Sequence, residues 1–148
     1  MTNPFRYYLR VRYGECDAQR VVFNPRWAEY VDICSTEFFR AIGFGEALAS
    51  GAFDYQVVKL TIEWKAPARF DQVLELSMYT AKLGHTSFTV VTEFRIARQE
   101  PIICRAETVY VNVASKTLTK LPLSPEVRAA LEAGAPGKTV DHASWAAS

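Results

Sequence analysis

Two carboxylates and a thiol stand close together near the N-terminus, in the segment Gly14-Glu15-Cys16-Asp17. A helical pattern begins a few residues later, at Asn24-Pro25. Asn can cap unpaired backbone N–H groups at a helix start, and Pro suits the first helical position. The free N–H groups and the positive dipole end of a helix favour developing negative charge. These residues therefore predict a usable oxyanion site.

Cys16 and Asp17 are the candidate reactive groups of this segment. Glu15 and Asp17 flank Cys16 and should raise the pKa of its thiol, and no His lies nearby to activate it. Asp17 needs no His, because an ionised carboxylate can act as a general base toward water or attack an activated carbonyl itself. The alternative is that Asp17 only hydrogen-bonds backbone amides in a turn, and the residues leave both interpretations open.

Several other chemistries lack their motifs. The chain contains no GxGxxG, GxxxxGK[ST], GxSxG or HExxH pattern, so dinucleotide, P-loop, serine-hydrolase and zinc-protease functions have no local support. His85 and His142 are its two histidines, and neither has a second ligand at metal-binding spacing. Three cysteines without CxxC spacing fit neither a disulfide scaffold nor a zinc site. We expect no metal.

The elements that must position these residues follow from hydrophobic periodicity. Apolar residues recur at helical spacing from Asn24-Pro25 until a stop at Gly43, and a polar tail over 134–148 follows a short helix at about 125–133. Period-two alternation predicts strands at 5–13, 58–65, 74–79, about 86–97 and about 102–113. This order predicts an α+β fold with a long antiparallel sheet of five to six strands wrapped around one long central helix.

Length and charge limit the remaining possibilities. The 148 residues suit a single domain, 1–148, and a net charge of +1 offers no general attraction for nucleic acid or anionic membranes. No apolar run is long enough to span a bilayer, and the cysteines suit a reducing compartment, so we expect a cytoplasmic protein. A long sheet leaves open edges, and pairing with a second copy would cover them. We therefore expect a homo-oligomer.

Residues 13–43 closely resemble the active-site segment of the 4-hydroxybenzoyl-CoA thioesterase family of hot-dog-fold enzymes. Two stretches match that segment in order and spacing: Tyr13-Gly14-Glu15-Cys16-Asp17 and Val21-Val22-Phe23-Asn24-Pro25. The similarity continues at the level of fold through most of residues 5–122. Arg20 is a departure, because the family usually has Gly at this position.

The resemblance implies a homodimer with active sites at subunit interfaces, assembling further to a homotetramer. It implies hydrolysis of acyl-CoA or a related acyl thioester without a cofactor, since CoA is part of the substrate. Asp17 takes the position of the catalytic aspartate, as base or nucleophile, and the backbone N–H of Asn24 takes the position that polarises the thioester carbonyl. Arg20 then lowers the pKa of Asp17, meets a CoA phosphate, or distorts the loop.

Further residues are candidates for substrate contact. Val22, Phe23 and Trp27 are placed to line an acyl pocket, although Trp27, like Tyr30, equally suits the helix core. The segment with Thr86 and Ser87 passes near substrate from the partner subunit in family members. His85 reads as a surface turn residue. Basic partners for CoA phosphates are Lys65, Arg69, Lys82 and Lys116.

Two other functions stay open at this point. A hot-dog hydratase or dehydratase acting on hydroxyacyl thioesters would rely on a His paired with a carboxylate, and the long helix contains no His. A non-catalytic acyl-thioester or lipid-binding scaffold is the second alternative, and Arg20 is the residue that favours it. Tight binding of CoA esters without turnover would distinguish the scaffold from the enzyme.

Overall fold

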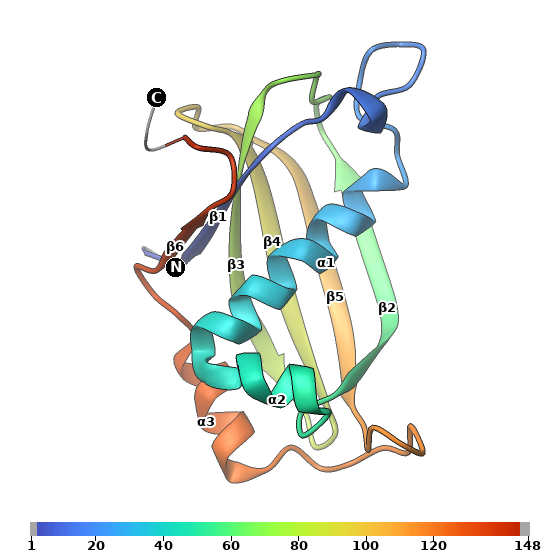
Figure 1. The fold of residues 1–148 in the computed structure, drawn as a ribbon, viewed down its shortest axis with the longest axis vertical. Helices are drawn as coiled ribbons and strands as arrows, with labels where there is room; N and C mark the ends of the chain where they lie inside the picture. Colours follow the sequence, from blue (N-terminus) through green and yellow to red (C-terminus); the bar gives the residue numbers. More distant parts are fainter. Residues whose placement is uncertain (1–2, 146–148) are drawn as a thin grey trace.

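A six-stranded sheet forms the body of the protein in the computed structural model, which describes residues 3–145. The strands lie in the order β2-β5-β4-β3-β1-β6 (Figure 1). Their bounds are β1 Phe5–Arg10, β2 Tyr55–Trp64, β3 Val73–Leu83, β4 Ser87–Ile96, β5 Ile102–Asn112 and β6 Thr139–Asp141. All neighbouring strands are antiparallel except β1 and β6, which are parallel. The α+β architecture is confirmed, and β6 makes the sheet mixed.

One long helix, α1 (Arg26–Phe39), crosses the concave face of this sheet (Figure 1). Its inner face buries aromatic side chains; the ring of Phe39 alone contacts those of Phe53, Tyr55, Phe88 and Tyr110 at centroid distances of 5.0–5.9 Å. The helical spacing of apolar residues thus provides the core that the sheet encloses.

The expected helix stop at Gly43 is only partly correct. The α-helix ends at Phe39, a π-helical turn covers Arg40–Phe44, and a short helix α2 continues over Gly45–Ser50. Gly43 adopts φ 106°, which an L side chain rarely tolerates. Glycine therefore breaks the helical path here, but the chain resumes a helix instead of entering a loop.

The expected strand over 5–13 is shorter in the structure. After β1 ends at Arg10, a 3₁₀ turn forms over Tyr13–Glu15. The backbone N–H of Glu15 donates to the carbonyl of Arg12 over 3.0 Å, and the Glu15 carboxylate accepts from the Arg12 N–H over 2.7 Å. These local hydrogen bonds compete with the sheet and turn the chain away from it.

The C-terminal segment contains more structure than a polar tail. The short helix α3 spans Pro125–Ala133 as expected, with the Ser124 hydroxyl accepting from the N–H of Val127 over 3.1 Å. Within the predicted tail, β6 pairs with β1, and the Tyr7 hydroxyl lies 2.9 Å from Nδ1 of His142. Residues 146–148 lie outside the described residues. A strand of three residues leaves too short a pattern to predict from periodicity.

The strand β2 has one unpaired edge and exposes apolar side chains. Val57, Val58, Leu60 and Trp64 are all exposed, and Val58 retains 58% of its accessible surface. A long apolar edge strand is an aggregation hazard unless another chain covers it. Within residues 3–145, no helix is long and apolar enough to cross a membrane.

Candidate active site

Residues 15–23 form a small β-hairpin, here named the acidic hairpin, immediately before α1. The N–H of Asp17 donates to the carbonyl of Val21, and that of Phe23 donates to the carbonyl of Glu15, each over 2.9 Å. Its tip is a turn closed by the Arg20 N–H on the Asp17 carbonyl, also 2.9 Å. This local backbone pairing makes the segment an ordered arm beside the start of α1.

Asp17 uses one carboxylate oxygen in the turn and leaves the other unpaired. Its Oδ1 accepts from the Gln19 N–H over 2.8 Å and so holds the turn. Its Oδ2 makes no hydrogen bond to any residue in 3–145. The half-buried side chain lines a cavity of about 250 Å³, the Asp17 cavity, with Tyr13, Cys16, Arg20 and Phe70. One carboxylate oxygen is therefore structural, and the other is free for chemistry.

Exposed aromatic rings border the Asp17 cavity. Tyr13 is 81% exposed and meets the ring of Phe70 edge to face, with centroids 5.6 Å apart. Sequence reasoning did not select either residue as a contact. Tyr13 belongs to the matched motif and was available as a signal, but Phe70 comes from the β2–β3 connection and only the fold brings it here.

Asn24 lies at the start of α1 beside a different cavity. This cavity of about 290 Å³, the Asn24 cavity, is lined by Val21, Val22, Asn24, Trp27, Trp64, Lys65, Ala66 and Pro67. The expected side-chain cap by Asn24 does not form. Pro25 occupies the N-cap position of α1, and no side chain caps the helix there. The Asn24 N–H has no hydrogen-bond partner among the described residues. This backbone N–H therefore has no intramolecular acceptor, as the donor of an oxyanion site requires.

Val22, Phe23 and Trp27 differ in their surroundings. Val22 is buried, and its N–H donates to the Ala68 carbonyl over 2.8 Å. Trp27 is also buried, with its ring 5.1 Å from that of Phe94, while part of its side chain lines the Asn24 cavity. Phe23 is exposed and lines neither cavity. Within one chain, Trp27 is both core and cavity wall.

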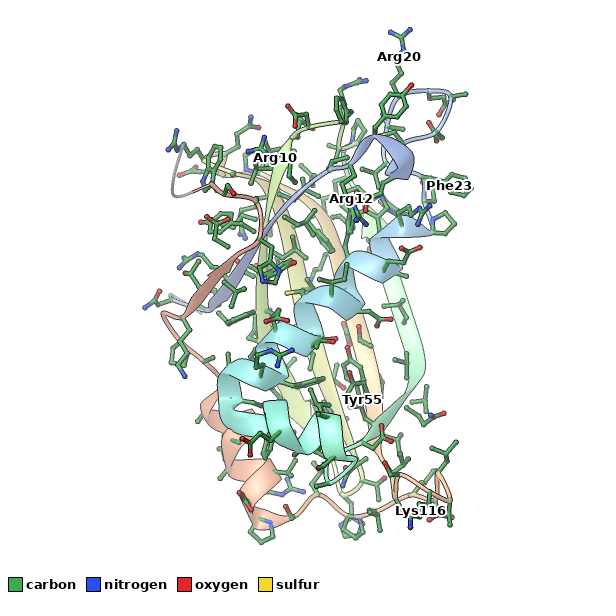
Figure 2. All side chains as sticks on the ribbon, in the orientation of Figure 1. Arg10, Arg12, Arg20, Phe23, Tyr55 and Lys116 are labelled. Atoms are coloured by element: carbon green, nitrogen blue, oxygen red, sulfur yellow. The ribbon has the colours of Figure 1, made fainter. Side chains whose placement is uncertain are left out.

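Thr86 and Ser87 lie at the opposite end of the sheet from the acidic hairpin. Ser87 opens β4, and the Thr86 carbonyl accepts from the N–H of Asn112 at the end of β5. Lys82 and Lys116 belong to this same end, where Figure 2 labels Lys116. Arg20 extends outward from the hairpin tip, away from the body of the protein (Figure 2). One chain alone does not bring Thr86 or Ser87 to Asp17.

Arg20 adopts a left-handed conformation, with φ 66°. For a residue with a Cβ this conformation costs about 1–2 kcal/mol relative to the right-handed region. The hairpin still closes around it, since the hydrogen bonds at Asp17 are formed. Arg20 therefore adopts a left-handed backbone conformation that glycine usually occupies.

Glu15, two residues before Asp17, is 5% exposed and fully hydrogen-bonded. Its Oε1 accepts from the Arg12 N–H and from the Tyr30 hydroxyl over 2.7 and 2.9 Å, and its Oε2 accepts from Nε and Nη2 of Arg12 over 3.0 and 2.9 Å. Burial opposes ionisation, but these donors outweigh it and hold the pKa of Glu15 below its ordinary value. We name this set of contacts the Glu15 clamp.

Cys16 is an unfavourable nucleophile. Burial, together with the negative charges of Glu15 and Asp17, raises the pKa of its thiol above the ordinary value. His85 and His142 do not line the Asp17 cavity, so no imidazole is present there to remove its proton. Among residues 3–145, no three His, Cys, Asp or Glu side chains are grouped to hold a metal ion.

Comparison with known proteins places this geometry in a family. The family model for the thioesterase-like superfamily matches residues 11–131. The acyl-CoA thioester hydrolase YbgC of Escherichia coli O6:H1 is 31% identical over 113 residues, which cover 76% of this chain and 84% of that protein. A putative esterase of Aquifex aeolicus is 24% identical over 120 residues, covering 80% and 92%.

Solved structures share the fold. Gentisyl-coenzyme A thioesterase BH1999 aligns with a TM-score of 0.73 and 23% identity over 85% of this chain and 98% of that one. An Asp-to-Asn variant of 4-hydroxybenzoyl-CoA thioesterase, complexed with 4-hydroxybenzoyl-CoA, aligns with a TM-score of 0.76 and 15% identity over 86% and 97%. By family model, sequence identity and fold, this chain is a member of the thioesterase-like superfamily and has the hot-dog architecture.

Proposed function

We propose that this protein is an acyl-CoA thioesterase that hydrolyses an acyl or aromatic acyl thioester to the free acid and CoA. The observation that carries the proposal is Asp17, which has an unpaired Oδ2 and lines a cavity on a hairpin directly before the N-terminus of α1. The 31% identity to an acyl-CoA thioester hydrolase supports the reaction class.

Asp17 acts as general base or as nucleophile in this proposal. As a base, it takes a proton from water while the water oxygen bonds to the thioester carbon; as a nucleophile, its oxygen bonds to that carbon, and water then hydrolyses the anhydride. In both cases the Asn24 N–H stabilises the oxyanion, the C–S bond breaks and CoA leaves as a thiolate. A thiolate is a good leaving group, so strong acid assistance, a metal and a further cofactor are unnecessary.

The two cavities must join around one substrate. A base and an oxyanion donor act only within about 3 Å of the same reacting group, whereas Asp17 and Asn24 line separate cavities in the single chain. We therefore propose that a second copy completes the site. Lys65, which lines the Asn24 cavity, and the exposed side chains of Arg69 and Arg20 are available at this end to bind CoA phosphates.

The exposed edge of β2 is the proposed surface for this pairing. Antiparallel pairing of β2 with its copy would bring the end of one chain that carries the acidic hairpin beside the partner's opposite end (Figure 1). Ser87 and Thr86 lie at that opposite end: Ser87 pairs with Val111, which pairs with Gln56 near the start of β2. This geometry supports substrate contact by Thr86 and Ser87 across the interface in a homodimer that assembles to a homotetramer.

Sedimentation of the purified chain tests the assembly. The wild type should sediment as a dimer or tetramer, and Val58→Lys, which places a charge on the exposed edge, should shift it toward the monomer. Ala129→Lys, which adds the same charge at an exposed position of α3, is the matched control and should leave the assembly unchanged. A monomeric wild type would contradict the proposed completion of the site.

Thiol release from short, medium, long and aromatic acyl-CoAs tests the reaction. Wild type should turn over at least one ester, and Asp17→Asn should lose at least about a hundredfold in kcat, within the usual scale of acid–base catalysis. Asp32→Asn, the same change on the exposed face of α1, is the control and should retain activity. Tight CoA-ester binding without turnover would favour a binding scaffold instead.

The free thiols of Cys16, Cys34 and Cys104 suit a reducing compartment, and we propose the cytoplasm. A hydratase function is disfavoured because α1 contains no His to pair with a carboxylate, and neither does the Asp17 cavity of the single chain.

A further inference from the structure

Glu15 and Asp17 share a hairpin strand but differ in their free hydrogen-bonding capacity. The Glu15 carboxylate accepts four hydrogen bonds from Arg12 and Tyr30, at 2.7–3.0 Å, and the side chain is buried. A carboxylate whose oxygens are engaged in this way has no vacant position from which to take a proton from a substrate or water. Glu15 is therefore unsuited to acid–base chemistry, and its ionised state must serve another purpose.

The contacts of Glu15 connect three parts of the site. Its side chain binds Tyr30, which lies in the second turn of α1, while its backbone carbonyl accepts from the N–H of Phe23, the residue before Asn24. Asp17 follows two residues later on the same hairpin strand. Tyr30 packs edge to face on Trp27, with ring centroids 6.0 Å apart, and Trp27 lines the Asn24 cavity.

We propose that Glu15 is a positioning residue: through the Glu15 clamp it fixes the acidic hairpin on α1, and so sets Asp17 relative to the Asn24 N–H. The inference rests on the proposed thioesterase function for its catalytic meaning. Val22 anchors the other strand of the hairpin, since its side chain is buried and its N–H donates to the Ala68 carbonyl, whereas the strand that carries Asp17 is hydrogen-bonded to α1 through Glu15 and Tyr30. Loss of the Tyr30 contact should let the hairpin shift without unfolding the sheet.

Removal of one hydroxyl tests the clamp with the smallest change. Tyr30→Phe deletes the donor to Glu15, whereas Tyr7→Phe deletes a hydroxyl that borders the same cavity as Tyr30 but lies 2.9 Å from Nδ1 of His142 and makes no hydrogen bond to the hairpin. We expect kcat for an acyl-CoA to fall about ten- to hundredfold in Tyr30→Phe, the scale of a misplaced catalytic group, with KM changed less than about threefold. Tyr7→Phe should keep both constants near the wild type. A merely destabilising substitution would lower the melting temperature and leave kcat of the folded enzyme unchanged.

Backbone amide hydrogen exchange reports on the clamp independently of catalysis. The Asp17 and Phe23 amides close the hairpin, so Tyr30→Phe and Glu15→Gln should accelerate their exchange about tenfold, and Tyr7→Phe should not. Unchanged exchange, or accelerated exchange with wild-type kcat, would overturn the positioning role. If the wild type turns over no acyl-CoA, the thioesterase proposal fails, and exchange at these two amides alone then decides whether Glu15 holds the hairpin on α1.

Discussion

The base and the tip of the acidic hairpin each carry a carboxylate, but the two carboxylates differ in their hydrogen-bond partners. At the base, Glu15 is buried and its oxygens accept four hydrogen bonds. At the tip, Asp17 keeps Oδ2 unpaired beside a cavity, and Arg20 holds a left-handed backbone conformation. A carboxylate with all of its acceptors engaged gives order, whereas one with a vacant acceptor can do chemistry. The number of partners, and not the residue type, separates these roles.

The largest stability difference between base and tip should come from Glu15→Ala. This change leaves the Tyr30 hydroxyl buried without a partner and should lower the free energy of unfolding by about 3 kcal/mol. Asp17→Ala removes one turn hydrogen bond at a half-exposed site and should cost about 1 kcal/mol or less. Urea denaturation of both variants measures the difference, and equal losses would remove the distinction.

Low pH should reduce the contribution of ionised Glu15 to the free energy of unfolding. The pKa of Glu15 is lowered on folding from its ordinary value of 4.5, because the Arg12 and Tyr30 donors outweigh the opposing effect of burial. Its ionisation therefore stabilises the fold fully above pH 4.5, and this contribution is lost as pH falls through the lower folded-state pKa. The gap in unfolding free energy between wild type and Glu15→Gln should be constant near neutral pH and narrow below 4.5. A gap that widens in acid would contradict this assignment.

At the tip, Arg20→Gly should stabilise the protein by up to about 1 kcal/mol, because it relieves the left-handed strain but adds freedom to the unfolded chain. Arg20→Ala is the matched control: it removes the same charge but keeps a Cβ at φ 66°, so no gain is expected. Thermal unfolding of the pair separates backbone strain from charge. A gain in both variants would mean that the guanidinium, and not the backbone, is unfavourable.

The smallest stability effect should come from Tyr13→Leu. Tyr13 is 81% exposed, so the unfolding free energy should change by less than about 0.5 kcal/mol. The ring nevertheless borders the Asp17 cavity and meets Phe70, so KM for an acyl-CoA should rise. Unchanged KM together with unchanged stability would exclude Tyr13 from substrate binding.

Regular periodicity predicted the regular parts of the fold. The apolar stripe of α1 and the alternation along β1 to β5 placed these elements within a few residues of their observed bounds. Burial of one face determines these patterns except in β2, whose side chains are mostly exposed in the single chain. The helix beyond Gly43 and the strand β6 were missed. A π-helical turn follows neither period, and β6 depends on β1, far away in sequence, for its pairing.

The sequence selected only those residues of the candidate site that lie close together along the chain. Asp17 and Asn24 were selected because a carboxylate precedes a predicted helix start by seven residues. Phe70 and Trp64 come to the cavities through the sheet, and Glu15 resembled a second reactive acid until its contacts with Arg12 and Tyr30 were known. In the single chain Asp17 and Asn24 line separate cavities, an arrangement that no local sequence pattern reports.

The most direct test compares Asp17→Asn with Glu15→Gln in one experiment that records kcat for acyl-CoA hydrolysis and the melting temperature. If Asp17 is the catalytic carboxylate and Glu15 positions the hairpin, Asp17→Asn should lose at least about a hundredfold in kcat with a nearly unchanged melting temperature. For Glu15→Gln the same assignment predicts a smaller loss of kcat with a lowered melting temperature. The reverse pattern, or full activity in Asp17→Asn, would contradict the assignment of chemistry to Asp17 and of order to Glu15.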